Sequence, residues 1–229
     1  LLAYGDLNLP TNVPANQYIL IKGEKASASR GVGKNLNDYL DEWNPDSLRY
    51  ALASILPEQN DSEISEDEMI RRNNEELVAA WGNLVQRVFS QYINNFENLE
   101  FDFELTDVDK KIIDEGNDCF EKTGELIEKV ELKSSLQSVM GYVNKINAYL
   151  NETEPWKVIK EDSSRATAIL HTSLTAIEAC ASLFTPFMPT TSEIVKGAIE
   201  KNTNNNWSVN DIKKGAPLQD IGHLFKKFD

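Results

Sequence analysis

The strongest constraint in this 229-residue sequence is a succession of helix start signals that continues through most of the chain. Asn44-Pro45 combines an N-cap residue with a proline at the first helical position, and predicts a helix over 45–55. Ser65 and Glu68 have the spacing of a capping box, ahead of a long helix that we expect to reach about residue 96. These signals predict a mainly α fold.

The second half of the chain continues this pattern. Thr106 and Asp109 have the spacing of a cap but do not read as a true capping box, and they precede a predicted helix to about residue 130. Apolar residues recur at helical spacing further on, and a break is expected at 151–155. The remaining predicted helices cover 132–150, 164–184 and 191–200. Helices of this kind bury their apolar faces against each other, which predicts a bundle.

The first 34 residues differ from the rest. They are rich in loop-forming residues and contain one short β-prone run at 17–21. An isolated strand is not stable in water, so this run needs a sheet to join. The chain starts with Leu1 rather than Met, so we interpret the segment as the end of a domain whose body lies outside this sequence. The predicted organisation is 1–34, end of that domain; 35–62, connecting helices; 63–200, helical bundle; and 201–229, C-terminal tail.

The charge distribution limits the classes of partner. The chain has 37 acidic and 23 basic residues, and residues 57–131 carry the whole excess, with 21 acidic and 7 basic. Such a balance disfavours non-specific nucleic-acid binding, although it permits a local base-reading site. Two cysteines exclude a disulfide framework and a four-cysteine zinc site. Short apolar runs and the lack of a leader predict a cytoplasmic protein without a membrane span.

One loop carries the residue types that phosphate chemistry uses. Residues 25–33 are small or polar and include Lys25 and Arg30, directly after the β-prone run. Backbone N–H groups and cations in such a loop can bind phosphate. Taken alone, the segment is more often a flexible surface loop.

The wider context of this loop resembles a known family. Residues 16–31 resemble the strand and KMSKS loop of class I methionyl-tRNA synthetases. The motifs that follow in the family's order are Asn44-Pro45-Asp46-Ser47-Leu48-Arg49-Tyr50, Pro57-Glu58, Asp61, Arg72-Asn73-Asn74-Glu75-Glu76-Leu77 and Trp81-Gly82-Asn83-Leu84. The resemblance covers essentially the whole chain. It implies the end of a Rossmann catalytic domain followed by the anticodon-binding helical bundle of class Ia aminoacyl-tRNA synthetases.

The resemblance also implies roles for the loop residues. Ala26 stands where the family has Met, and Ala28 stands where it has the second Lys, which would stabilise charge on the ATP phosphates. Arg30 directly follows the signature, and we expect Arg30 and Lys25 to be the catalytic cations. The implied ATP-binding residues are Lys25, Ser27 and Ser29.

A second group of residues is implied to bind the anticodon. Arg87 is the single charged residue in 77–96, and Asn83 lies four residues earlier, hence on the same helix face. A guanidinium and an amide can read the edges of splayed-out bases, although without context an exposed arginine is the ordinary explanation. The family places the matching residues at the anticodon. It also places Pro155 and Trp156 there, with the indole as a stacking platform, which is compatible with packing of its other face on the bundle.

The function that the resemblance implies is that of a methionine–tRNA ligase. The intact enzyme would activate methionine with ATP and charge tRNA(Met), which has a CAU anticodon. The family's HIGH motif and zinc-binding insertion lie upstream of Leu1, so this chain alone is expected to be inactive and to hold no metal. His171 and His223 have no partners at ligand spacing. We expect no appended OB-fold dimerisation domain after Asp229, and therefore expect a monomer.

Three other functions compete with this one. A free-standing tRNA-anticodon-binding module without catalytic activity would explain the altered loop signature. An isoleucine, valine or leucine enzyme has a corresponding bundle, but the joint presence of Asn83, Arg87 and Pro155-Trp156 argues against it. A purely structural scaffold is the third alternative.

Overall fold

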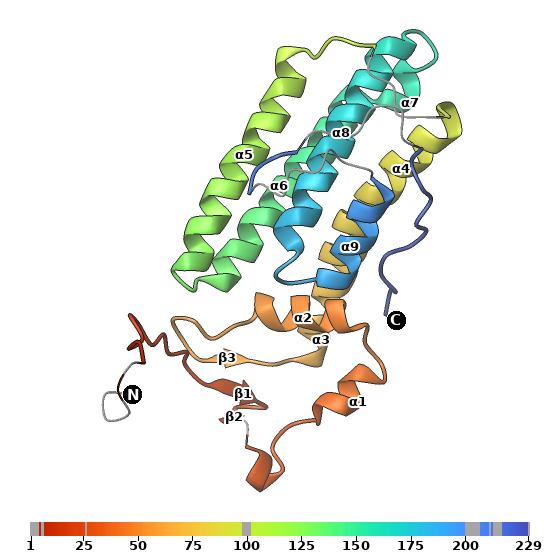
Figure 1. Cartoon of the computed structure of the whole chain (residues 1–229). Coiled ribbons are helices and arrows are strands. Elements are labelled where there is room, and N and C mark those ends of the chain that lie inside the picture. The colour runs from red at the N-terminus through yellow and green to blue at the C-terminus, as the bar shows by residue number, and fades with distance from the viewer. Residues whose placement is uncertain are drawn as a thin grey trace.

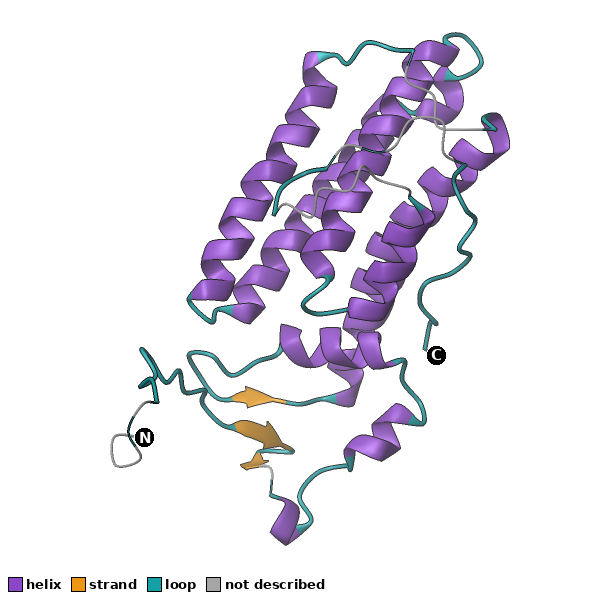
Figure 2. Ribbon diagram, viewed as in Figure 1, coloured by secondary structure: helices purple, strands orange, loops and turns teal. Residues whose placement is uncertain are grey.

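A computed structural model describes residues 5, 7–25, 27–97, 102–199, 207–210, 212 and 217–228. A bundle of long helices occupies one end of the molecule, and a small unit with a short sheet occupies the other (Figure 1). Helices predominate over strands throughout (Figure 2), so the mainly α prediction is confirmed.

Three helices of equal length form the centre of the bundle: α5 (Asp107–Glu128), α6 (Leu132–Thr153) and α8 (Ser163–Phe184). They run alongside each other (Figure 1) and contribute most of one large apolar core. Helix α8 is long and apolar enough to cross a membrane by length and composition, but 89% of the relevant window is buried inside the protein. It is therefore the central helix of the bundle core.

The long helix predicted over 66–96 is continuous but not uniform. It consists of α3 (Glu66–Arg72), the π-helical segment η2 (Asn73–Gly82) and α4 (Asn83–Asn95). The prediction of one regular α-helix is therefore wrong in its middle. The Asn73 side chain is buried there and donates to the Lys226 carbonyl at 2.9 Å, which ties the segment to the C-terminal tail. Such distant contacts are invisible to helical periodicity.

Two predicted caps differ from the structure. Ser65 accepts from the Glu68 backbone at 3.5 Å, but the Glu68 carboxylate binds Arg71 and Arg72 instead of closing the capping box. Conversely, Thr106 and Asp109 form a full capping box, with the Thr106 N–H donating to Asp109 Oδ2 at 2.8 Å. The Asp109 carboxylate reaches back far enough to close the capping box, so the prediction that these two residues do not form one is wrong.

The smaller helices are α1 (Leu36–Leu40), α2 (Pro45–Ser54), α7 (Pro155–Val158) and α9 (Pro189–Ala198). Helix α2 matches its prediction, and Asn44 Oδ1 accepts from the Asp46 N–H at 2.9 Å. Helix α9 begins two residues earlier than expected, while Glu200 lies outside the described residues. Helices α1 and α7 are single short turns that sequence analysis missed.

The β-prone run finds its sheet inside this chain. Strand β1 (Ile19–Ile21) pairs antiparallel with β2 (Glu24–Lys25) and parallel with β3 (Ser62–Glu63), in the order β2-β1-β3. The sheet therefore joins the first 34 residues to the segment that follows α2, across one of the predicted domain boundaries.

A second apolar core lies beside α2 and connects the two ends of the molecule. It contains Trp43, Leu48, Ala51, Ile55 and Met69. Phe228 from the tail stacks on Trp43, with ring centroids 4.3 Å apart. On the bundle side, Arg49 donates to the carbonyls of Phe187 and Pro186 at 2.9 Å each. Trp43, Trp81 and Phe184 are buried, and so are the free thiols of Cys119 and Cys180.

Candidate functional site

The loop at 25–33 is held by its own backbone. Ser27 and Val32 exchange hydrogen bonds at 3.1 and 3.0 Å, which close the loop at its base. Gly31 at its tip has a φ of 67°, a left-handed conformation that glycine adopts without strain. The Ser27 and Ser29 hydroxyl oxygens lie 3.2 Å apart. The loop is therefore a compact turn that presents two hydroxyl groups together.

Both predicted cations of this loop are exposed. The Lys25 ammonium lies 3.5 Å from the centroid of the Tyr18 ring, a cation–π contact. The Arg30 guanidinium donates to the Lys25 carbonyl at 3.2 Å, so the two residues are neighbours. Of the two substituted positions, Ala28 starts the 3₁₀ turn Ala28–Arg30, and Ala26 lies outside the described residues.

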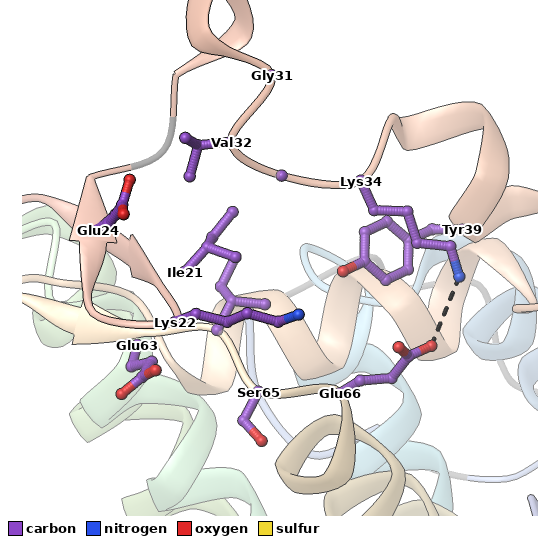
Figure 3. A pocket seen from close by; sticks show the side chains of 12 residues that line it. Ile21, Lys22, Glu24, Gly31, Val32, Lys34, Tyr39, Glu63, Ser65 and Glu66 are labelled. Atoms are coloured by element: carbon purple, nitrogen blue, oxygen red, sulfur yellow. Dashed lines mark ion pairs between the residues drawn. The ribbon is translucent and has the colours of Figure 1, made fainter.

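A cavity of about 660 Å³ lies behind the loop (Figure 3). Lys34 lines one side of the cavity. Its ammonium lies 3.1 Å from a carboxylate oxygen of Glu42 and 3.5 Å from one of Glu66. The same ammonium lies 4.8 Å from the centroid of the Tyr39 ring. These two carboxylates raise the pKa of Lys34. The predicted loop residues Lys25 and Arg30 lie outside the cavity lining.

The second predicted site lies on α4, at the other end of the molecule. Its buried face is apolar and packs in the bundle core, so Asn83 and Arg87 lie on the outer face. Asn83 is exposed and Arg87 is half-buried. The structure thus bears out the expected shared face of these two residues, one helical turn apart.

Trp156 reaches this face from a separate part of the chain. Pro155 is buried at the first position of α7, after Glu154, whose φ of 42° turns the chain sharply at the end of α6. The half-buried indole then lies beside α4, with the Arg87 guanidinium carbon 5.3 Å from its ring centroid. The structure therefore brings together Arg87 and Trp156, which are far apart in the sequence.

Asn151 is a member of this site that sequence analysis missed. Its Oδ1 accepts a hydrogen bond from Arg87 Nη2 at 3.1 Å. The sequence predicts a break at 151–155, whereas α6 continues to Thr153, so Asn151 lies on a helix. No local pattern reveals a contact between residues that are 64 positions apart. Arg87 is therefore held between a ring and an amide.

A buried polar cluster anchors the end of α6 that carries Asn151. Asp109 is fully buried, accepts from Arg165 Nη2 at 2.9 Å and also accepts from the Tyr149 hydroxyl. Burial by itself would raise the pKa of Asp109, but the bonds from Arg165, Tyr149 and Thr106 outweigh it and hold that pKa below its usual value. The cluster joins α5, α6 and α8 near the Trp156 end.

Metal binding has no visible support in the part of the chain that the structure describes. Within the described residues, no group of three or more histidine, cysteine, aspartate or glutamate side chains could hold an ion. His171 instead contacts the Phe103 ring, with centroids 4.9 Å apart.

Comparison with known families matches nearly the whole chain. Residues 1–89 match the family described as class I tRNA synthetases (M). Residues 102–229 match the family described as the anticodon binding domain of methionyl tRNA ligase. The second match alone covers more than half of the chain.

Curated relatives and solved structures agree with these matches. The methionine–tRNA ligase of Chloroflexus aggregans is 40% identical over 187 residues, covering 82% of this chain and 31% of the relative. That of Corynebacterium efficiens is 34% identical over 224 residues, covering 95% and 36%. The chain thus spans about a third of the length of these curated relatives.

The fold is similar to that of Mycobacterium tuberculosis methionyl-tRNA synthetase. Its apo form superposes with a TM-score of 0.87 at 19% identity, covering 100% of this chain and 46% of that one. The complex with methionyl-adenylate gives the same TM-score at 21% identity, covering 98% and 46%.

Proposed function

Because the chain belongs to the methionyl-tRNA synthetase family, we propose that it is the tRNA-binding part of a cytoplasmic methionine–tRNA ligase. The full-length protein activates methionine with ATP and charges a tRNA that has a CAU anticodon. Within the full-length protein, residues 63–200 recognise the anticodon and residues 1–34 complete the catalytic domain. Residues 35–62 connect these two parts.

One observation carries the anticodon part of this proposal. Arg87, Asn151 and Trp156 meet on one surface, although they come from three helices, α4, α6 and α7. An arginine held in place can read the edge of an unpaired base, because its donors have a fixed geometry. A half-exposed indole beside it can stack on a neighbouring base. Asn83 adds an amide on the same face, and buried Pro155 fixes the position of the ring.

The loop at 25–33 is proposed to act on the phosphates of ATP. Lys25 and Arg30 are neighbouring exposed cations, and Ser27 and Ser29 present hydroxyl groups beside them. ATP supplies the phosphoanhydride bond, and the cations stabilise the negative charge that grows on the leaving pyrophosphate. Arg30 takes the role of the lysine that the family has at Ala28.

The comparisons favour this function over a free-standing anticodon-binding module. Relatives that align with 82% and 95% of the chain are named as methionine–tRNA ligases. The altered loop signature therefore occurs within a chain that aligns over most of its length with relatives named as methionine–tRNA ligases.

Amino-acid-dependent exchange of pyrophosphate into ATP tests the proposal in the full-length protein. We expect exchange with methionine well above that with isoleucine, valine or leucine, and transfer of methionine to tRNA with a CAU anticodon. Exchange that is stimulated equally by leucine or isoleucine, or that is absent with every amino acid, would contradict the proposal.

A further inference from the structure

A second cavity lies directly beside Asn83, between the long helix and the C-terminal tail. Its volume is about 340 Å³, within the range of small-ligand sites. One wall comes from the end of η2 and the start of α4, and the other from the tail. The residues that define it are Gly82, Asn83, Gln86, His223, Leu224 and Phe225.

The walls of this cavity are fixed by packing. A Cβ atom on Gly82 would lie 2.9 Å from the Leu77 carbonyl oxygen, so the helix itself needs a glycine here, and Phe225 Cδ2 lies at contact distance from the same position, 3.4 Å away. Phe225 is buried, and Asn73 Nδ2 donates to the next carbonyl, that of Lys226, at 2.9 Å. The tail is thereby held against the helix on one side of the cavity.

The lining is suited to a flat, uncharged, hydrogen-bonding group. Asn83 and Gln86 lie three positions apart and present two amides, each with both donors and an acceptor. His223 is exposed and brings an aromatic ring from the tail. Among the described residues that line it, none is a lysine or arginine, which disfavours a phosphate as the occupant. Amide edges combined with a ring are the features that recognise an unpaired nucleobase.

We propose that this cavity receives one unpaired base of the anticodon loop, in addition to the base that stacks on Trp156. The inference rests on the proposed function, because it requires the loop to lie on the Arg87 face. Asn83 belongs to both sites: it lines the cavity and lies one turn from Arg87. Gln86 contacts the edge of the inserted base, and His223 stacks on its face. Gln86 and His223 are therefore specificity-determining residues.

The test uses the full-length protein and RNA hairpins that carry the CAU anticodon loop, with 2-aminopurine placed in turn at each loop position. We expect one position other than the Trp156-stacked base to change its fluorescence on binding, and His223→Ala to abolish that change. His223→Ala should weaken hairpin binding by about fivefold or more, the lower end of what aromatic stacking on a base contributes. Gln86→Ala should weaken it by about fivefold, which corresponds to roughly one hydrogen bond to the base edge. His223→Tyr keeps a ring and should bind within about twofold of wild type.

Two controls separate this inference from the proposed function. Gln137 is an exposed glutamine near the start of α6, at the opposite end of that helix from Asn151, and Gln137→Ala should leave binding unchanged. If binding depends on Arg87 and Trp156 but is unaffected by His223→Ala and Gln86→Ala, the cavity is not a base site and the function stands. If wild type binds the hairpin no better than an unrelated one, and Arg87→Ala has no effect, the proposed function itself fails.

Discussion

Arg87 and Trp156 should contribute to anticodon binding as a coupled pair. The guanidinium carbon of Arg87 lies 5.3 Å from the centroid of the Trp156 ring, and Asn151 holds the same guanidinium at 3.1 Å. Replacing Trp156 by alanine therefore removes a stacking platform and also releases one of the two restraints on Arg87. The effects of the two substitutions cannot be independent.

The expected magnitudes follow from these contacts. Trp156→Ala should lose about 1–3 kcal/mol of tRNA binding, the range for a base stacked on an aromatic ring. Arg87→Ala should lose a similar ~1–3 kcal/mol through base-edge hydrogen bonds. The shared cation–π contact is still open to solvent, and such contacts at exposed sites are worth about 0.5–1 kcal/mol. The double variant should therefore lose about 0.5–1 kcal/mol less than the sum of the single losses.

A double-mutant cycle on full-length protein measures this coupling. Dissociation constants for tRNA with a CAU anticodon are determined at two salt concentrations for wild type, both single variants and the double variant. Trp156→Ala should barely change the salt dependence, whereas Arg87→Ala should reduce it, because only the arginine attracts phosphate. Lys145 pairs with Glu115 across α5 and α6, and Lys145→Ala serves as the additive control with Arg87→Ala.

Additivity would refute the reasoning. If the double variant loses the sum of the single losses within about 0.3–0.5 kcal/mol, Arg87 and Trp156 act as independent contacts. The cation–π contact in the structure would then have no part in tRNA binding.

Three further predictions concern other parts of the chain. In the full-length enzyme, Arg30→Ala or Lys25→Ala should raise the barrier to adenylate formation by about 2.7–4 kcal/mol and leave methionine binding almost unchanged. Pre-steady-state assays measure this rate. An unchanged rate for Arg30→Ala would show that Arg30 does not compensate for Ala28. Asp109→Asn should reduce the free energy of unfolding by about 1.5–3 kcal/mol at pH 7. The pKa of Asp109 is lower in the folded state than in the unfolded state, where it is about 3.9. Its stabilising contribution is therefore fully present above the unfolded pKa and is lost as the pH falls through the folded pKa. In denaturant titrations, the free energy of unfolding should fall less steeply with acid for Asp109→Asn than for wild type. The 229-residue chain alone should not support methionine-dependent pyrophosphate exchange, and exchange above background by the purified chain would overturn that expectation.

The sequence predicted most helices because their signals are local. Asn44 lies directly before the helix that it caps, and the apolar spacing of α6 and α8 is that of a regular helix. The π-helical segment η2 and the strand pairing of β1 with β3 were missed, because both depend on contacts between distant residues. In particular, Asn73 interacts with a carbonyl 153 positions away.

The candidate site shows the same division. Spacing placed Asn83 and Arg87 on one face, since helical neighbours are fixed by the repeat. The role of Asn151 and the contact of Arg87 with Trp156 could not be predicted from local sequence patterns, because α6 and α7 reach α4 only through tertiary packing. Gln86 and His223 line a cavity that forms where the tail packs on the helix, so no local pattern could point to them.

The most direct test of this account compares methionine charging of a tRNA with a CAU anticodon and of single-base anticodon variants. The measured quantity is kcat/KM for wild type, Arg87→Ala and Trp156→Ala full-length protein. We expect wild type to prefer CAU strongly, and both variants to lose most of that preference while still activating methionine at the wild-type rate. A preference for CAU that is undiminished in both variants would show that the anticodon is read elsewhere.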